Sequence, residues 1–117
     1  APKDCLVEGD RLVFLVPAGE MAAAIGQAGE TVEEAERRLG KSVELVEDAD
    51  TPEAFVASAL APAAVNAVTV SEQNDRVAYV EVPEPDRGVA IGADGANIET
   101  ARALAKRHHD IDDIQLT

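Results

Sequence analysis

The stretch Ile25-Gly26-Gln27-Ala28-Gly29 occurs a second time, in altered form, as Ile91-Gly92-Ala93-Asp94-Gly95. Further residues match at the same offset; the pairs include Pro17 with Pro83, Val32 with Ile98, and Ala35 with Ala101. One supersecondary unit is therefore used twice, and an internal repeat of this kind constrains the architecture before any local prediction is made.

The segments around the first copy alternate between strand and helix signals. The predicted elements are strands at 3–8 and 11–16, helices at 18–25 and 30–39, and a strand at 41–47. Gly9-Asp10 is typical of a hairpin turn between the first two strands. Gly40 is typical of the left-handed residue that ends a helix.

A polar stretch without apolar periodicity follows the first unit and predicts a boundary that divides the chain into 1–48 and 49–117. Thr51 and Pro52 are typical of an N-cap and a first helical residue. The predicted elements of the second unit are a helix at 52–60, strands at 65–71 and 76–82, a short helix after Pro83, a longer helix ending near Arg107, and a strand at 111–116. The second unit thus has the order α-β-β-α-α-β, and the first shows the same order without its opening helix.

Glycines at both ends of the Gly-x-x-Gly loop have a physical consequence. A residue without a Cβ adopts backbone conformations closed to others and lets a ligand backbone approach closely. The N–H groups at the start of the following helix lack intrahelical partners and attract phosphate oxygens. A loop of this kind is therefore suited to a sugar-phosphate chain. A single Gly-x-x-Gly is common as a helix-helix turn, but two copies in matching contexts argue for a shared fold.

Two helices joined through Gly-x-x-Gly beside a three-stranded sheet resemble the KH nucleic-acid-binding domain in its type II topology. The compact tandem order, with Ala61-Pro62-Ala63 at the junction and residues 105–113 before the last strand, is similar to the small archaeal NusA-like transcription termination/antitermination proteins. The resemblance implies an α+β fold of two tandem KH type II domains, the first lacking its opening helix. That absence suggests a trimmed N-terminus or a sheet face covered by a partner.

The resemblance also implies that the chain binds single-stranded RNA and acts with RNA polymerase, without catalysis and without a cofactor. The predicted RNA-binding residues are Ile25, Gly26, Gln27, Ala28, Gly29, Arg37, Arg38, Lys41, Ile91, Gly92, Ala93, Asp94, Gly95, Arg102 and Lys106. For the cations among them a second interpretation is open, because positive side chains near a helix C-terminus are favoured by the helix dipole alone.

The residues between the glycines leave a different function open. Loops of this family usually carry lysine or arginine there, whereas this chain has Gln27-Ala28 and Ala93-Asp94. Asp94 would face a phosphate with like charge. The alternative function is an adaptor that keeps the KH fold and binds protein, such as RNA polymerase, with little direct RNA contact.

The composition is strongly acidic, with 23 Asp and Glu against 10 Lys and Arg and a formal net charge of −13 over 117 residues. Disorder is disfavoured because 46% of the residues are hydrophobic and they are periodic. Molar salt shortens the Debye length to about 3 Å and screens such self-repulsion. We therefore expect a salt-loving source organism, so that the acidity reflects the solvent more than the partner.

Several residues have both a structural and a functional interpretation. Cys5 is expected to be a small buried residue, and Phe14 and Tyr79 are expected in the core, since aromatic residues on alternating strands normally pack inward. His108-His109-Asp110 could suggest a metal site, but adjacent histidines diverge and no companion ligand set is present, so we expect a helix end there.

Other function classes lack a sequence signal. No nucleotide-binding fingerprint or nucleophile-base set is present, so we expect no enzyme, no cofactor and no metal. No apolar run approaches eighteen residues and no leader is seen, so we expect a soluble cytoplasmic protein.

Overall fold

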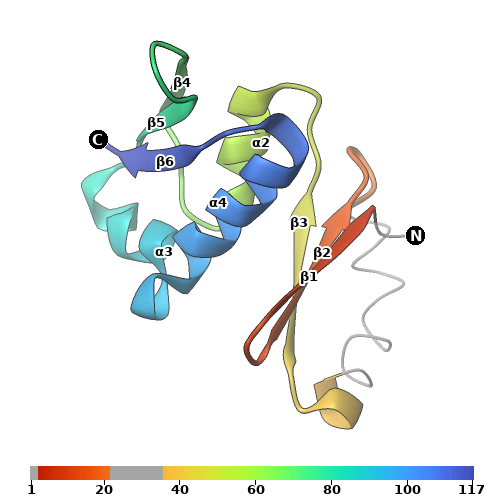
Figure 1. Cartoon of the computed structure of the whole chain (residues 1–117). Coiled ribbons are helices and arrows are strands. Elements are labelled where there is room, and N and C mark those ends of the chain that lie inside the picture. Colours follow the sequence, from red (N-terminus) through yellow and green to blue (C-terminus); the bar gives the residue numbers. More distant parts are fainter. Residues whose placement is uncertain (1–2, 22–35) are drawn as a thin grey trace. The chain divides into compact units, whose positions relative to one another are not determined.

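The chain divides into two compact units, Ala1–Asp48 and Ala49–Thr117 (Figure 1). Within them, the computed structural model describes residues 3–21 and 36–117. Each described unit contains a small three-stranded sheet, and helices occur in both. The protein is thus a mixed α+β protein, and each unit is described by itself.

The first unit is built on the sheet β1-β2-β3, with the bounds β1 Asp4–Glu8, β2 Arg11–Val16 and β3 Ser42–Glu47. β1 runs antiparallel to β2, and β3 runs parallel to β2. The hairpin prediction is confirmed, because Gly9 has a φ of 55° between β1 and β2. Gly40 has a φ of 66° and donates its N–H to Glu36 at 2.9 Å, so the predicted left-handed helix end is also confirmed.

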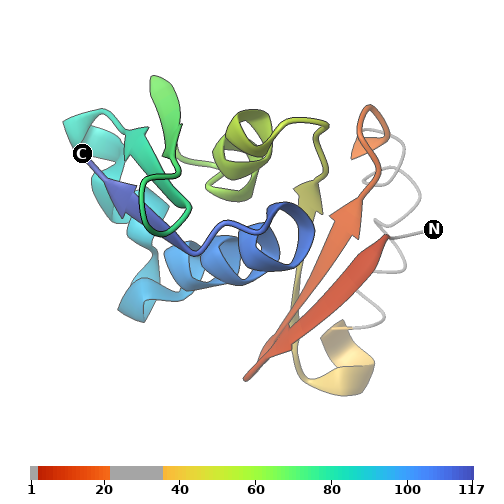
Figure 2. The same cartoon turned by 45° about the horizontal axis from the view of Figure 1, so that its top comes forward.

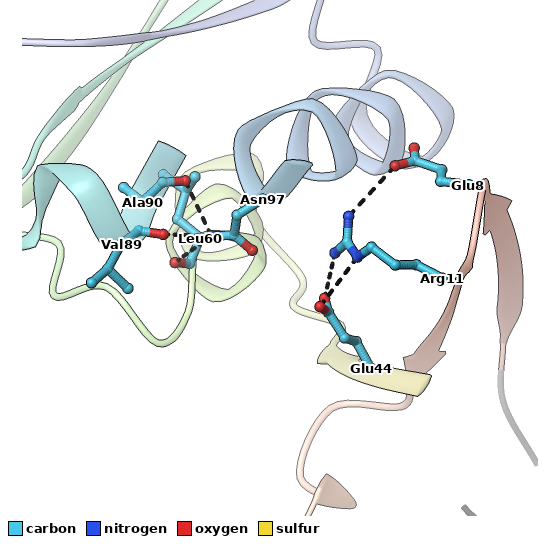
Figure 3. A network of polar contacts seen from close by, with 7 residues as sticks. All are labelled: Glu8, Arg11, Glu44, Leu60, Val89, Ala90 and Asn97. Atoms are coloured by element: carbon cyan, nitrogen blue, oxygen red, sulfur yellow. Dashed lines mark hydrogen bonds and ion pairs between the residues drawn. The ribbon is translucent and has the colours of Figure 1, made fainter. Parts of the chain in front are cut away.

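Arg11 connects the strands of the first sheet. Its guanidinium forms two bonds to the Glu44 carboxylate, at 3.2 Å from Nε and 2.5 Å from Nη2, and lies 3.8 Å from Glu8 (Figure 3). Such a two-bond fork fixes the side chains in one geometry. Arg11 therefore ties β3 to the beginning of β2.

The helix predicted at 18–25 begins later than expected. Residues 18–20 form a turn, and the described helical structure starts at Met21. The reason is local: Gly19 has a φ of 81°, Glu20 donates to the Pro17 carbonyl at 3.1 Å, and the Gly19 N–H bonds the Glu47 carboxylate at 2.9 Å. Residues 22–25 of this predicted helix and residues 30–35 of the next predicted one lie outside the described residues.

In the second unit, helices pack against one three-stranded sheet. Its elements are α2 Pro52–Ala59, β4 Ala67–Ser71, β5 Val77–Glu81, the short 3₁₀ turn η1 Glu84–Asp86, α3 Arg87–Ile91, the 3₁₀ turn η2 Ala93–Gly95, α4 Ala96–His109 and β6 Asp113–Leu116. β4 pairs antiparallel and β6 parallel with the central strand β5, which repeats the strand directions of the first sheet.

The second unit's core lies where α2 and α4 cross the sheet (Figures 1 and 2). α2 starts as predicted, because Thr51 accepts the Ala54 N–H at 3.2 Å and Pro52 occupies the first turn. Phe55, Leu104 and Ile114 are fully buried. Burying each such side chain contributes about 1.5–3 kcal/mol. The position of α4 on the sheet thus depends mainly on apolar packing.

Three predictions about side-chain environment are wrong. Tyr79 is 39% exposed, because its neighbours Ala78 and Val80 on β5 both point inward and the strand alternates. Phe14 is only half-buried on β2, and Cys5 is exposed on the edge strand β1.

The prediction of a helix end at the two histidines is confirmed. α4 ends at His109, and Asp110 follows in the left-handed conformation with a φ of 54°. The rings of His108 and His109 lie 5.9 and 4.7 Å from that of Phe55. Among residues 3–21 and 36–117, no group of three or more metal-ligating side chains is found.

None of the helices in the described part of the chain combines the length and the apolar character needed to cross a bilayer.

Candidate nucleic-acid interface

The second Gly-x-x-Gly loop joins α3 to α4 through three unusual backbone conformations. Gly92 has a φ of 80° and a ψ of 172°, a region open almost only to glycine. Asp94 and Gly95 both have positive φ, at 55° and 77°. The chain thereby leaves α3, makes one 3₁₀ turn and enters α4 at Ala96.

The two glycines of this loop have different surroundings. A Cβ on Gly92 would lie 2.8 Å from both the Cβ and the backbone nitrogen of Asn97, closer than real side chains approach. A Cβ on Gly95 would meet nothing within 4 Å. Gly92 therefore permits close contact between the loop and α4, whereas Gly95 leaves the outer side of the loop open.

Beside the loop lies an open groove with a volume of about 470 Å³. It is lined by residues of α3, the loop, α4 and β6: Arg87, Ile91, Gly95, Ile98, Glu99, Arg102, Gln115 and Leu116. The structure thus brings Ile91, Gly95 and Arg102, all predicted from the sequence, to one groove. Ile91 is 39% exposed there, so the groove has an apolar side next to the open face of Gly95.

Arg102 is used largely within the protein. Its Nε and Nη2 donate to the Ile114 carbonyl at 3.3 and 2.9 Å, and its Nε lies 2.9 Å from Asp113 Oδ1. Its Nη1 lies 2.5 Å from Glu99. Two carboxylates therefore neutralise the guanidinium that α4 contributes to the groove.

Lys106 does not line the groove. Its ammonium lies 2.6 Å from Asp112 Oδ1. The hydrogen bond from Lys106, followed by one from the Arg76 N–H, lowers the pKa of Asp112, and the same bond raises the pKa of Lys106. The pair joins the end of α4 to the segment that enters β6.

Arg87 is a positively charged residue that lines the groove but was not among the RNA-binding residues predicted from the sequence. It lies four residues before Ile91 on α3, a spacing that places both on one helix face. Its Nη1 donates to the Thr117 carbonyl at 3.0 Å. The (i, i+4) spacing could have identified Arg87. Gln115 and Leu116 could not be found in this way, because their place depends on the parallel pairing of β6 with β5.

In the first unit, only part of the predicted site belongs to the described residues. Ile25, Gly26, Gln27, Ala28 and Gly29 lie outside them. Arg37 and Arg38 are exposed. Lys41 donates to the Gly9 carbonyl at 2.7 Å, which links the start of β3 to the first hairpin.

The comparisons with known proteins agree with this fold. Residues 52–117, which include the groove and the second loop, match the family model of the NusA-like second KH domain. The chain belongs to the family of NusA-like proteins with KH domains.

The similarity to individual proteins extends over nearly the whole chain. The "Probable transcription termination protein NusA" of Halobacterium salinarum is 65% identical over 114 residues, which cover 97% of this chain and 82% of that protein. The protein of the same name from Halococcus morrhuae is 63% identical over 113 residues, covering 97% and 81%. The crystal structure of APE1850 is similar with a TM-score of 0.83 and 29% identity, covering 99% of this chain and 86% of that one.

The relatives from Halobacterium salinarum and Halococcus morrhuae come from halophilic archaea. The prediction of a NusA-like protein from a salt-loving archaeon is therefore confirmed.

Proposed function

We propose that this chain binds single-stranded RNA along grooves beside its Gly-x-x-Gly loops and acts in transcription termination or antitermination, with RNA polymerase as its protein partner. The observation that carries this proposal is the groove of the second unit, in which the exposed Ile91 lies beside the open face of Gly95. An unpaired base stacks on an apolar side, and a sugar-phosphate chain needs a close approach that no Cβ blocks. The names of the halobacterial relatives support the transcriptional role.

We further propose that the chain is a tandem of KH type II domains, 1–48 and 49–117. The repeated Gly-x-x-Gly and the equal strand directions of the two sheets support it. The first loop and the cations Arg37, Arg38 and Lys41 would form the second RNA contact. The protein would act in the cytoplasm, where transcription occurs, and would perform no catalysis.

The strength of binding would depend little on salt. In multimolar salt the release of counterions from RNA contributes almost nothing to the binding free energy. Arg102, the α4 cation that lines the groove, is already paired with two carboxylates. Affinity would come from close backbone approach, apolar contact and hydrogen bonds to base edges. We expect the RNA affinity to vary weakly with KCl over the range in which the protein is folded.

The test is fluorescence anisotropy with labelled random single-stranded RNA in concentrated KCl. Gly29→Asp and Gly95→Asp each place a carboxylate on one loop, and we expect each to weaken binding. Gln73→Asp is the matched control, since it adds the same charge at an exposed turn between β4 and β5. Equal affinity of all four proteins would remove both loops from the mechanism. A steep dependence on KCl would contradict the proposed source of the affinity.

One observation favours the second candidate, a protein adaptor for RNA polymerase. Asp94 is exposed at the tip of the loop, where a bound phosphate would pass. If the wild-type protein binds no RNA under any KCl concentration that keeps it folded, while it is retained by purified archaeal RNA polymerase, the adaptor function replaces the proposal.

A further inference from the structure

The side-chain amide of Asn97 connects three helices of the second unit. Its Nδ2 lies 3.1 Å from the Ala90 carbonyl, 3.2 Å from that of Leu60 and 3.4 Å from that of Val89 (Figure 3). Asn97 is half-buried in the first turn of α4. One side chain of α4 thus contacts the ends of both α2 and α3.

The three carbonyls lie at helix ends, and the one of Leu60 also accepts the Ala63 N–H at 3.1 Å. Val89 and Ala90 lie in the last turn of α3, and Leu60 is the C-cap of α2. The last carbonyls of a helix have no intrahelical N–H partner, and they gain most from a side-chain donor when they are shielded from water. An uncharged amide supplies two protons from one nitrogen, whereas aspartate supplies none and serine only one.

Gly92 lies against the same residue. Its missing Cβ leaves space for Asn97, since an added Cβ would overlap both the Cβ and the backbone nitrogen there at 2.8 Å. The loop is therefore held on its inner side by a close contact at Gly92 and by the bonds of Asn97 to the carbonyls just before it. Its outer side, at Gly95, is open.

We propose that Asn97 is the positioning residue of the second Gly-x-x-Gly loop, fixing the end of α3 on the first turn of α4 so that Gly95 faces the groove ready for RNA. This proposal rests on the proposed RNA binding. Asn97 itself does not line the groove. It lowers the number of conformations that the free loop adopts, so that less conformational entropy is lost when RNA binds.

The test compares Asn97→Ala and Asn97→Asp with Ile111→Val, a small change in the buried core just beyond the opposite end of α4 from the loop. Hydrogen exchange of the Gly92–Gly95 amides and RNA affinity are measured for all three. In both Asn97 variants we expect loop exchange to rise and affinity to fall, each about three- to tenfold, because the partly buried hydrogen bonds to Leu60 and Ala90 are lost. Ile111→Val should change neither by more than about twofold on the same scale.

The outcomes separate the two proposals. If both Asn97 variants lose no more affinity and protection than Ile111→Val, Asn97 is merely structural and the inference is wrong. If the wild-type protein binds no RNA, the proposed function fails, yet loop exchange still decides whether Asn97 orders the loop.

A measurement on the wild-type protein covers the case in which the variants do not fold. The side-chain NH₂ protons of Asn97 should exchange slowly by NMR and keep their chemical shifts when RNA is added, while the Gly95 amide shifts. Exchange of these protons at the rate of a free amide would overturn the inference.

Discussion

Arg102 donates two hydrogen bonds to the carbonyl oxygen of Ile114, at 3.3 and 2.9 Å, and so joins α4 to the strand β6. A planar guanidinium can make this fork and still reach Glu99 and Asp113, whereas an ammonium cannot. Arg102, which was predicted from its helix position to contact phosphate, is therefore part of the groove wall.

Arg102→Lys tests this role. We expect it to lower the free energy of unfolding by about 1–2 kcal/mol, since the charge is kept but the fork to the backbone is lost. Arg107→Lys, at an exposed position of the same helix, should cost much less. Both are measured by denaturant unfolding in constant KCl. If Arg102→Lys is as stable as the wild type but binds RNA far more weakly, the guanidinium is a ligand contact instead.

The two glycines of the second loop should respond differently to alanine. Gly92→Ala combines a nearly glycine-only conformation with overlap against Asn97, and we expect a loss of about 2–5 kcal/mol. Gly95→Ala has a positive φ but free space, and we expect a loss of about 1–2 kcal/mol. Thermal unfolding of the two variants gives the comparison, and equal losses would show that overlap with Asn97 is not significant.

Substitutions of Asp94 test whether the second loop approaches phosphate. Asp94→Asn removes the charge and keeps a residue type that tolerates the φ of 55°. Asp94→Lys adds a cation as well. We expect RNA affinity to rise in the order wild type, Asp94→Asn, Asp94→Lys. The slope of log affinity against log KCl concentration should be steeper by about one for Asp94→Lys than for the wild type. The same affinity in all three proteins would mean that RNA passes elsewhere.

The Lys106–Asp112 pair predicts a pH dependence of stability. The pKa of Asp112 is lowered by the bond from Lys106, so this carboxylate stabilises the fold above its unfolded pKa and loses that contribution as the pH falls through the lowered value. The pKa of Lys106 is raised, so its contribution is present at neutral pH and is lost as the pH rises through the raised value.

Asp112→Asn should therefore melt below the wild type at neutral pH, and the difference should shrink below about pH 4 and again above about pH 10.5. The melting temperatures are compared at the lowest KCl concentration that keeps both proteins folded, because salt screens an exposed pair. A difference that is the same from pH 3 to pH 11 would contradict the assignment of this pair.

The local features of the fold could be read from neighbouring residues. Thr51-Pro52 at the start of α2, the hairpin glycine Gly9 and the left-handed Gly40 were all predicted, because each depends on backbone preferences within a few positions. The repeated Ile-Gly-x-x-Gly also pointed to the family, since a repeat is recognised without knowledge of distant contacts. One local prediction was wrong in its start, because a turn with Gly19 at positive φ occupies residues 18–20 and helical structure begins only at Met21.

Partners from distant parts of the chain could not be read in this way. Alternation alone does not say which face of β5 meets the helices, so Tyr79 was placed in the core although it is exposed. Asn97 finds its acceptor on Leu60 only because α2 and α4 pack together, and Arg102 finds Ile114 only because β6 lies parallel to β5. The sequence contains the donors and acceptors of the groove. Which of them pair with each other within the protein depends on distances that are set only when the helices pack on the sheet.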